Sequence, residues 1–383
     1  MTQAKRKILV AMSGGVDSSV AAALLLRDGH EVIGAFMKNW SEDEDACTGD
    51  CGWKRERADA LRVAAKLGIK FETLDFEAEY KAAVVDYMVR EYAAGRTPNP
   101  DVMCNRDIKF GPFLKAAERL GCDAIATGHY ARIGSVEREA GSVKSNANEN
   151  SPLQTSRFTL LAGLDPNKDQ SYFLHRLNQD QLSRTLFPVG HLLKPEVRRL
   201  AAEFGLPTAD KKDSQGICFI GKVDLAGFLR DRLPPQSSGF IVTVKGEVIG
   251  KHDGLAHFTV GQRHGLGVGG GAPLYVVRKD LAANTLIVTD DRNDVALQTS
   301  RLLGDEVHWI SGAAPDLPFR CQARIRYRQP LQSAAVAADP GRPAGIAVVF
   351  DVPQRAVSPG QFCVFYDGDE CLGGATIAAA GAV

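Results

Sequence analysis

The chain has 383 residues, enough for two or three domains, and its 44% hydrophobic and 24% charged residues predict a packed core. Its 46 basic and 46 acidic residues cancel, so the net charge gives no sign of a nucleic-acid partner, although a local basic face would suffice to bind RNA. The sequence shows no run of about 18 apolar residues and no signal-peptide pattern, which favours a cytoplasmic protein without a membrane partner. Eight cysteines in such a chain are more typical of thiols, ligands or catalysts than of a disulfide framework.

The first notable stretch is Ser-Gly-Gly-Val-Asp-Ser at residues 13–18, between a predicted strand at 8–11 and a predicted helix at 20–26. Glycine lets a ligand approach the backbone, and a helix N-terminus presents N–H groups and a positive dipole end. This loop is therefore typical of a phosphate site, and Asp17 adds a carboxylate suited to Mg²⁺. The loop lacks the Gly-Lys-Ser/Thr ending of a Walker A loop. The alternative to a phosphate site is a glycine turn that only reverses the chain.

Strands and helices then alternate along the chain. Further strands are predicted over residues 31–37, 70–74 and 123–127, and further helices over 53–67, 77–92, 108–120 and 194–204. This alternation predicts a doubly wound, mostly parallel α/β sheet that binds ligands at the carboxyl ends of its strands. His129 follows the strand at 123–127 and is a candidate site residue for that reason, although a lone histidine is more often structural.

Two cysteines lie in segments that the sequence predicts to be loops outside the hydrophobic core. Pro98 and Pro100 are expected to exclude helix and to stiffen the segment before Cys104. A helix N-terminus after Cys104 and the neighbouring Arg106 are expected to lower the pKa of its thiol, while a cysteine packed under the helix start is the alternative. Cys218 lies between glycines in a stretch, 211–221, that has the character of a mobile loop.

Two other segments are predicted to be surface loops without a catalytic role. Residues 39–52 are polar and acidic and include Cys47 and Cys51, which could form half of a metal site. No second pair with suitable spacing lies nearby, so a loop with two exposed thiols is favoured. Residues 134–156 are rich in Ser, Asn, Glu and Gly and are expected to form a flexible insertion.

The pattern changes after Asp224, where strands begin to dominate. Strands over 240–245, 275–279 and 285–289 predict a small central β-rich domain, whose glycine-rich basic loop at 259–267 is expected to face the substrate. From residue 302 onward the pattern is all-β and predicts a C-terminal barrel. We therefore expect an α/β domain over 1–220, a central domain over 221–298 and a barrel over 299–383.

The segment 320–328 carries four arginines at every second or fourth position. If it is one strand, Arg320, Arg324, Arg326 and Arg328 share one face and form a local basic stripe. We interpret this stripe as a phosphate-contacting surface. A solvated edge strand whose charges discourage aggregation is the alternative.

Together these motifs resemble the bacterial tRNA-specific 2-thiouridylases, a family within the PP-loop ATP pyrophosphatases, along nearly the whole chain except residues 134–156. The loop at 13–18 is shared more widely, whereas two strings are specific to this family: Asn-Pro-Asp-Val-Met-Cys at 99–104 and Gly-Ile-Cys-Phe-Ile-Gly at 216–221. Further matching strings are Gly-His-Tyr at 128–130, Asn-Lys-Asp-Gln-Ser-Tyr-Phe at 167–173, Gly-Gln-Arg-His-Gly-Leu-Gly at 261–267 and Arg-Tyr-Arg-Gln at 326–329.

The resemblance implies a PP-loop fold and an enzyme that replaces the C2 oxygen of the wobble uridine in tRNA with sulfur. ATP would adenylate that oxygen, and AMP would then leave as sulfur attacks C2. The residues implied in ATP binding are Ala11, Met12, Ser13, Gly14, Gly15, Val16, Asp17, Ser18, Met37 and Gly128. Mg²⁺ is expected with the ATP, and no other metal is.

The resemblance also implies roles for the two loop cysteines and for a set of tRNA contacts. Cys218 would carry a persulfide received from a sulfur-relay protein or a cysteine desulfurase. Cys104 would be the second catalytic thiol, close enough to Cys218 for a transient disulfide, and Asp101 would assist proton transfer. The residues implied in contacting tRNA or its target base are Asn99, Pro100, Asp101, His129, Lys168, Asp169, Gln170, Arg326, Tyr327 and Gln361.

Two other interpretations stay open at this point. A different PP-loop synthetase that acts on a small metabolite would explain the ATP loop but not the two loop cysteines or the arginine strand. A non-catalytic RNA-binding or metal-cluster protein would use Cys47, Cys51, Cys104 and Cys218 but would not explain the ATP loop. Release of pyrophosphate that requires tRNA and Cys104 separates the three.

Overall fold

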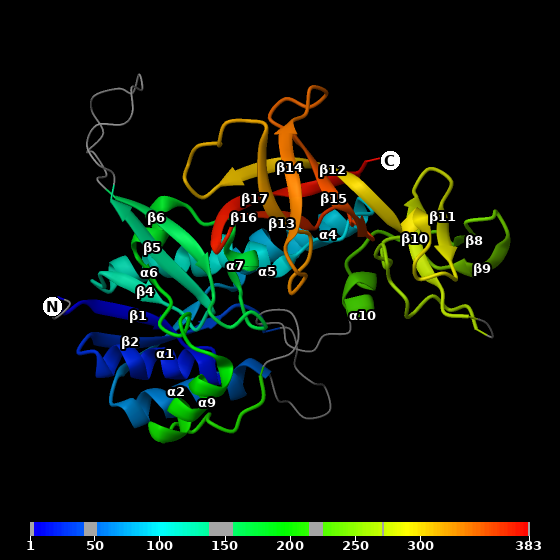
Figure 1. Cartoon of the computed structure of the whole chain (residues 1–383). Coiled ribbons are helices and arrows are strands. Elements are labelled where there is room, and N and C mark those ends of the chain that lie inside the picture. Colours follow the sequence, from blue (N-terminus) through cyan, green and yellow to red (C-terminus); the bar gives the residue numbers. More distant parts are fainter. Residues whose placement is uncertain (1–3, 42–51, 138–155, 214–224, 270–271, 382–383) are drawn as a thin grey trace.

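The computed structural model describes residues 4–41, 52–137, 156–213, 225–269 and 272–381. Its first sheet is parallel throughout, in the order β3-β2-β1-β4-β7 (Figure 1). These strands are β1 (Lys7–Ala11), β2 (Glu31–Lys38), β3 (Lys70–Asp75), β4 (Ala124–Ala126) and β7 (Thr185–Leu186). The strand order reverses at β1, so the switch point lies between β1 and β4, and the predicted doubly wound parallel sheet is confirmed.

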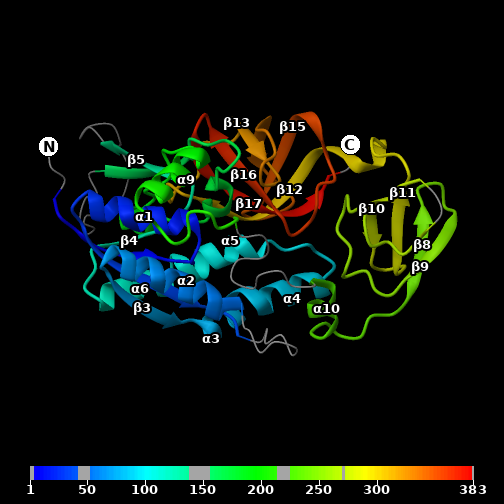
Figure 2. The ribbon, with the colours of Figure 1, turned by 90° about the horizontal axis from the view of Figure 1, so that it is seen from below.

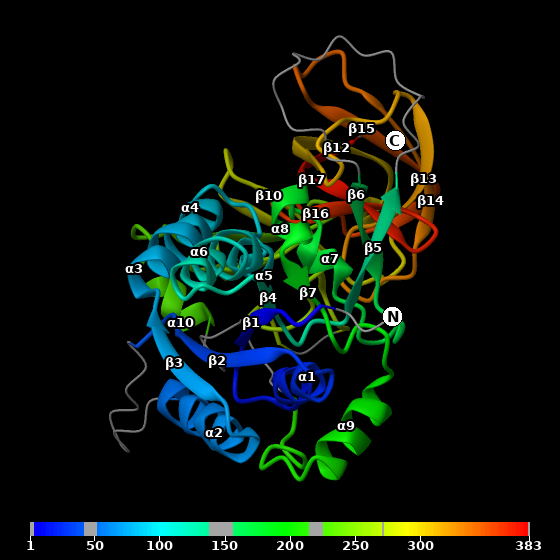
Figure 3. The same ribbon diagram turned by 90° about the vertical axis from the view of Figure 1, so that its left-hand side faces the viewer.

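Helices cover both faces of this sheet. Ile8 and Val10 belong to the hydrophobic core on one face, whereas Leu9 and Ala11 belong to the core on the other, as the alternation of a strand requires. Figure 3 shows the two layers. The first is made of α1 (Val16–Arg27), α2 (Gly52–Leu67) and α9 (Lys194–Glu203); the second includes α3 (Glu77–Tyr80), α4 (Asp86–Ala93), α5 (Pro100–Cys104) and α6 (Pro112–Arg119).

Two of the predicted helices contain irregular turns. The helix predicted over 77–92 includes the π-helical turn η1 (Lys81–Val85) between α3 and α4. The helix predicted over 108–120 is wrong in its first part, because the π-helical turn η2 (Asn105–Lys109) continues α5 and a new helix begins at Pro112. Proline at the first helical position has no N–H to donate to the preceding turn, which explains the break.

The C-terminal region forms a closed barrel. Its strands are β12 (Gln298–Trp309), β15 (Ile346–Arg355), β14 (Gln332–Ala338), β13 (Phe319–Arg324), β16 (Phe362–Asp367) and β17 (Glu370–Ala380), and β12 also pairs with β17. The predicted barrel is thus confirmed. Strand β6 (Ser156–Ala162) pairs with β17 and with β5 (Ala131–Glu137), so a hairpin from the α/β region extends the barrel sheet.

This hairpin corrects the prediction of an unstructured insertion over 134–156, which is wrong at both ends. Residues 134–137 belong to β5 and residue 156 begins β6, while 138–155 lie outside the described residues. The polar composition misled the prediction because the pairing that defines β5 is made by residues beyond the polar segment: Gly134 pairs with Thr159 and Ser135 with Phe158.

The central region has its own sheet and its own small core. The sheet order is β10-β11-β8-β9, with β8 (Gly239–Thr243), β9 (Val248–His252), β10 (Tyr275–Asp280) and β11 (Thr285–Thr289). It lies at the end of the molecule farthest from the N-terminus, beyond α10 (Leu225–Arg230) (Figure 2). Within the described ranges, every helix is too short or too polar to cross a bilayer.

Candidate active site

The loop after β1 leads directly into α1. Gly14 has a φ of +73°, and a Cβ atom there would lie 2.3 Å from the backbone oxygen of Glu56, so both conformation and space require glycine. Ser13 and Ser18 hold their hydroxyl oxygens 3.3 Å apart across the loop. Gly15 is the N-cap of α1 and makes no side-chain cap, which leaves the helix N-terminus open to an anion.

The predicted ATP residues lie on three adjacent carboxyl ends of the parallel sheet. Ala11 ends β1, the next residue, Met12, donates its N–H to the Ala35 oxygen of β2 at 2.8 Å, and Met37 lies near the end of β2. Gly128 follows β4, and a Cβ atom there would lie 2.6 Å from the backbone nitrogen of Ser18. The fold therefore brings these residues together at the switch point, where such sheets bind ligands.

A group of lysines surrounds this loop. The Lys194 ammonium, at the start of α9, lies 2.7 Å from Oδ1 of Asp17 and 2.9 Å from Oδ1 of Asp213. Lys211 donates to the Gly14 carbonyl at 3.0 Å, and Lys168 also pairs with Asp213. Burial by itself would raise the pKa of Asp213, but hydrogen bonds from Lys168 and Lys194 outweigh it and lower the pKa to about 2.

Sequence reasoning missed Lys194 and Lys211, because they approach the loop from 177 and 197 residues away. Asp17 suits Mg²⁺, since this ion needs only one or two carboxylates when phosphates and waters complete its shell. Its Oδ1 also accepts a hydrogen bond from the Tyr130 hydroxyl at 2.8 Å, which fixes the carboxylate at the helix start. Among the described residues, no three His, Cys, Asp or Glu side chains gather in a way that could hold a metal ion by themselves.

Cys104 is the last residue of a helix, which corrects the prediction of a helix-free loop. Pro100 occupies the first position of α5, where its missing N–H is no loss, and Asn99 caps the helix by accepting from the Val102 nitrogen at 3.4 Å. Cys104 therefore lies four residues beyond a helix start rather than before one. The expected effect of a helix N-terminus on its thiol therefore has no structural basis. The Arg106 guanidinium forms an ion pair with Asp107, in which Nε lies 2.7 Å from Oδ1.

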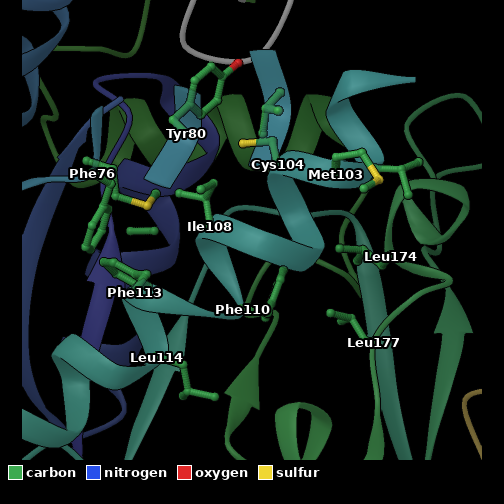
Figure 4. Packing of buried hydrophobic residues seen from close by; sticks show 14 of the residues in the cluster. Phe76, Tyr80, Met103, Cys104, Ile108, Phe110, Phe113, Leu114, Leu174 and Leu177 are labelled. Atoms are coloured by element: carbon green, nitrogen blue, oxygen red, sulfur yellow. The ribbon is translucent and has the colours of Figure 1, made fainter. Parts of the chain in front are cut away.

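The Cys104 side chain is fully buried, which contradicts the prediction that this thiol lies outside the hydrophobic core. Figure 4 shows it among Phe76, Tyr80, Met103 and Ile108. The alternative interpretation of the sequence, a cysteine packed under a helix start, is right about the burial, although Cys104 lies at the end of α5. A π-helical turn follows at once, a rare feature that is concentrated at functional sites and that no sequence signal here announces. Cys47, Cys51 and Cys218 lie outside the described residues.

Two of the residues implied in tRNA contact, Asn99 and Gln361, meet across 262 positions of sequence. The Asn99 amide nitrogen lies 3.4 Å from Oε1 of Gln361. The Gln361 amide nitrogen in turn donates to the carbonyl oxygens of Thr97 at 3.0 Å and Pro98 at 2.9 Å. The turn before β16 of the barrel is thus attached to the segment that leads into α5.

The predicted basic stripe at 320–328 does not form. Strand β13 ends at Arg324, and Arg328 has a φ of +63°, so the alternation of faces stops within the segment. Arg324 points inward and forms a buried ion pair with Asp169, whereas Arg320 pairs with Asp351 on the surface. Arg326 is half-buried and donates to the Ala356 carbonyl. Burial lowers the pKa of Arg326, and the nearby charge of Arg355 lowers it further.

The remaining candidates differ in how they are placed. His129 is buried, with its Nδ1 2.7 Å from the Thr127 hydroxyl, and burial together with the charge of Lys109 lowers its pKa well below the usual value. Gln170 accepts from the Tyr130 nitrogen at 3.0 Å, and the Tyr327 ring packs against Phe173 with a centroid separation of 4.6 Å. The Asp169 carboxylate is buried and forms an ion pair with Arg324, so it is not accessible to an external ligand.

Known proteins match the chain over almost its whole length. Family models described as tRNA methyl transferase HUP domain, tRNA methyl transferase PRC-barrel domain and aminomethyltransferase beta-barrel domain match residues 6–222, 226–290 and 299–377. The chain is 49% identical over 372 residues to tRNA-specific 2-thiouridylase MnmA 2 of Geobacillus kaustophilus. The aligned region covers 97% of this chain and 94% of that protein. It is also 49% identical to tRNA-specific 2-thiouridylase MnmA of Pseudomonas fluorescens, in an alignment that covers 97% of this chain and 95% of that protein.

Proposed function

The chain belongs to the family of tRNA-specific 2-thiouridylases, and we propose that it catalyses the ATP-dependent replacement of the C2 oxygen of the wobble uridine in tRNA by sulfur. The products are 2-thiouridine, AMP and pyrophosphate. The observation that carries the proposal is the glycine loop at the switch point of the parallel sheet, with the open N-terminus of α1 behind it. That loop suits an enzyme that cleaves ATP, which a simple RNA-binding protein does not need.

In the first step, the uridine O2 attacks the α-phosphorus of ATP and pyrophosphate leaves. Ala11 to Ser18, with Met37 and Gly128, hold the nucleotide at the carboxyl ends of β1, β2 and β4. Lys194 and Lys211 adjoin this loop and supply positive charge toward the leaving pyrophosphate. Mg²⁺ bound at Asp17 would neutralise further phosphate charge. Adenylation converts the C2 oxygen into part of a good leaving group.

In the second step, the terminal sulfur of a persulfide on Cys218 attacks C2, and the C2–O bond breaks to release AMP. Cys104 then attacks the Sγ atom of Cys218, the S–S bond breaks, and the sulfur stays on C2. This leaves a Cys104–Cys218 disulfide that a thiol reductant must reduce before the next persulfide arrives. The persulfide comes from a sulfur-relay protein or a cysteine desulfurase in the cytoplasm. Asp101, in the first turn of α5, assists proton transfer.

A base held in a duplex or stacked loop must leave its stack to be modified, so the protein needs both a base site and a backbone surface. We assign the target base to Asn99, Pro100 and Asp101 at the start of α5. We assign tRNA contacts to the regions of His129, Lys168, Gln170, Arg326, Tyr327 and Gln361. The buried pair with Arg324 gives Asp169 a structural role instead of a direct contact.

Methyl transfer, which the descriptions of two family models name, is the second candidate. It consumes no ATP at a phosphate loop and produces no pyrophosphate. The test therefore measures pyrophosphate, adenylated tRNA and thiolated tRNA separately, with ATP, tRNA and a persulfide donor present. Pyrophosphate release that depends on tRNA supports thiolation, whereas a methylated uridine without pyrophosphate release contradicts it.

The same assays on three variants test the assigned residues. Asp17→Ala is expected to abolish pyrophosphate release while tRNA affinity stays within about twofold. Cys104→Ser and Cys218→Ser are each expected to abolish thiolation but to retain adenylation, because adenylation precedes sulfur attack. Cys321→Ser, on strand β13 of the barrel, is the matched control and is expected to keep all three activities. Substantial thiolation by either serine variant would contradict the two-cysteine scheme.

A further inference from the structure

We propose that Gln361 is a positioning residue, which joins the barrel to the segment 95–99 and thereby fixes the start of α5 for the reaction. The inference rests on the proposed function for the roles of Asp101 and Cys104, but the contacts themselves do not depend on it. They connect two segments of the chain that lie far apart in sequence. We call the set formed by residues 359–361 and 97–99 the clasp.

The clasp is built from backbone as well as side-chain contacts. The Thr97 nitrogen donates to the Pro359 oxygen at 2.8 Å, and the Gln361 amide nitrogen donates to the carbonyls of Thr97 and Pro98. Gly360 has a φ of +91°, and a Cβ atom there would lie 2.9 Å from both the nitrogen and the oxygen of Thr97. Only glycine therefore lets the two backbones approach this closely.

The central domain touches the same segment from another side. The hydroxyls of Thr97 and Thr259 lie 3.2 Å apart, and a Cβ atom on Gly95 would lie 2.7 Å from the Leu281 side chain. Ser358, one residue before the clasp, donates to the Val260 carbonyl at 3.3 Å. Segment 95–99 is therefore the place where the barrel, the central domain and the α/β domain meet.

Asn99 carries the constraint into the helix. Its amide nitrogen reaches Gln361, while its amide oxygen caps α5 by accepting from the Val102 nitrogen. Asp101 lies in the first turn of that helix and Cys104 ends it, so both follow the position of the cap. Both N–H bonds of the Gln361 amide are used within the clasp, so this side chain is held in place from two sides. Misplacement of reacting groups by about 1 Å can cost roughly a hundredfold in rate.

The test compares Gln361→Met with the wild type, because methionine has similar length, no charge and no donor. Hydrogen exchange in the free protein is expected to be at least about tenfold faster at the amides of residues 97–104. The single-turnover rate of thiolation at saturating tRNA and ATP, which does not depend on tRNA affinity, is expected to fall at least about tenfold. Faster exchange with an unchanged rate, or unchanged exchange, overturns the proposal.

A second variant acts on the clasp without altering polar groups. Gly360→Ala pushes a methyl group into Thr97, and Gly312→Ala is its matched control in the same barrel, with a φ of +82° and no atom within 4 Å of its added Cβ. Only Gly360→Ala is expected to raise exchange over 97–104 and to lower the rate. Equal effects of the two variants would contradict the clasp.

The outcomes also separate this inference from the proposed function. A direct tRNA contact by Gln361 predicts weaker tRNA binding with an unchanged single-turnover rate, which overturns the positioning role. Hydrogen exchange needs no substrate, so it tests the clasp even if the wild-type protein makes no 2-thiouridine. In that case the proposed function fails, and the exchange contrast alone decides whether the clasp fixes α5.

Discussion

Replacing Arg324 by methionine is expected to destabilise the junction between the barrel and the α/β domain by about 3 kcal/mol. Arg324 and Asp169 are nearly fully buried, and removing one partner of such a pair leaves a buried charge, at about 3–5 kcal/mol. Asp169 would keep three other donors: the nitrogens of Gly163 and Ser171, both at 3.0 Å, and the Ser171 hydroxyl at 3.1 Å. These bonds place the expected loss at the lower end of that range.

The assay is urea-induced unfolding followed by intrinsic tryptophan fluorescence, to which Trp309 of the barrel contributes; its ring lies 5.6 Å from that of Phe365. Arg320→Met on the same strand is the matched control. Its ion pair with Asp351 is exposed and is expected to contribute less than about 1 kcal/mol. A double variant, Arg324→Met with Asp169→Asn, removes both charges and is expected to recover part of the loss. If Arg324→Met is no less stable than Arg320→Met but flattens the salt dependence of tRNA binding by about one unit, the basic-stripe interpretation was right after all.

Three further outcomes are expected. Gly128→Ala would place a methyl group 2.6 Å from the first turn of α1, so ATP affinity is expected to fall at least about tenfold in an ATP titration, with tRNA affinity unchanged. Burial lowers the pKa of His175 to about 3, so below about pH 6.5 the unfolded chain binds a proton that the folded chain does not. The free energy of unfolding should therefore fall by at most about 5 kcal/mol between pH 6.5 and 3, and it should fall less steeply in His175→Gln. Lys194→Met removes the ammonium beside Asp17 and is expected to lower the pyrophosphate-release rate at least about tenfold, whereas Arg199→Met, an exposed change on the same helix, should not.

Local patterns were enough to predict the parallel sheet, the glycine loop between β1 and α1, and the barrel. Apolar strands that alternate with helices specify buried parallel strands, and Ser-Gly-Gly between a strand and a helix specifies a loop at a carboxyl edge. The same kind of reasoning failed at Cys104, because proline was treated only as a helix breaker. Pro100 sits at the one helical position that tolerates it, directly after an asparagine cap.

The arginine segment failed for a different reason, which is that its partners are distant in sequence. Alternation predicts a face only while the strand continues, and this strand ends where the Ile325 nitrogen donates to the Gln329 side chain at 3.0 Å. The carboxylate that neutralises Arg324 lies 155 residues earlier, within the motif at 167–173. Lys194 was missed in the same way, because nothing near it in the sequence refers to the phosphate loop.

Three of the long-range connections that the described residues of the barrel make end close to the segments proposed to carry the reaction. Strand β17 pairs with the β5–β6 hairpin, which begins next to Gly128 and His129. Arg324 holds Asp169, in the motif that precedes α7 (Ser171–Leu174), and Gln361 holds the segment before α5. A barrel that moved freely would break all three, so the barrel and the α/β domain are expected to behave as one body. A large RNA bound along both would then find the base site and the phosphate loop at a fixed separation, and ordering the catalytic segment would require little of its binding energy.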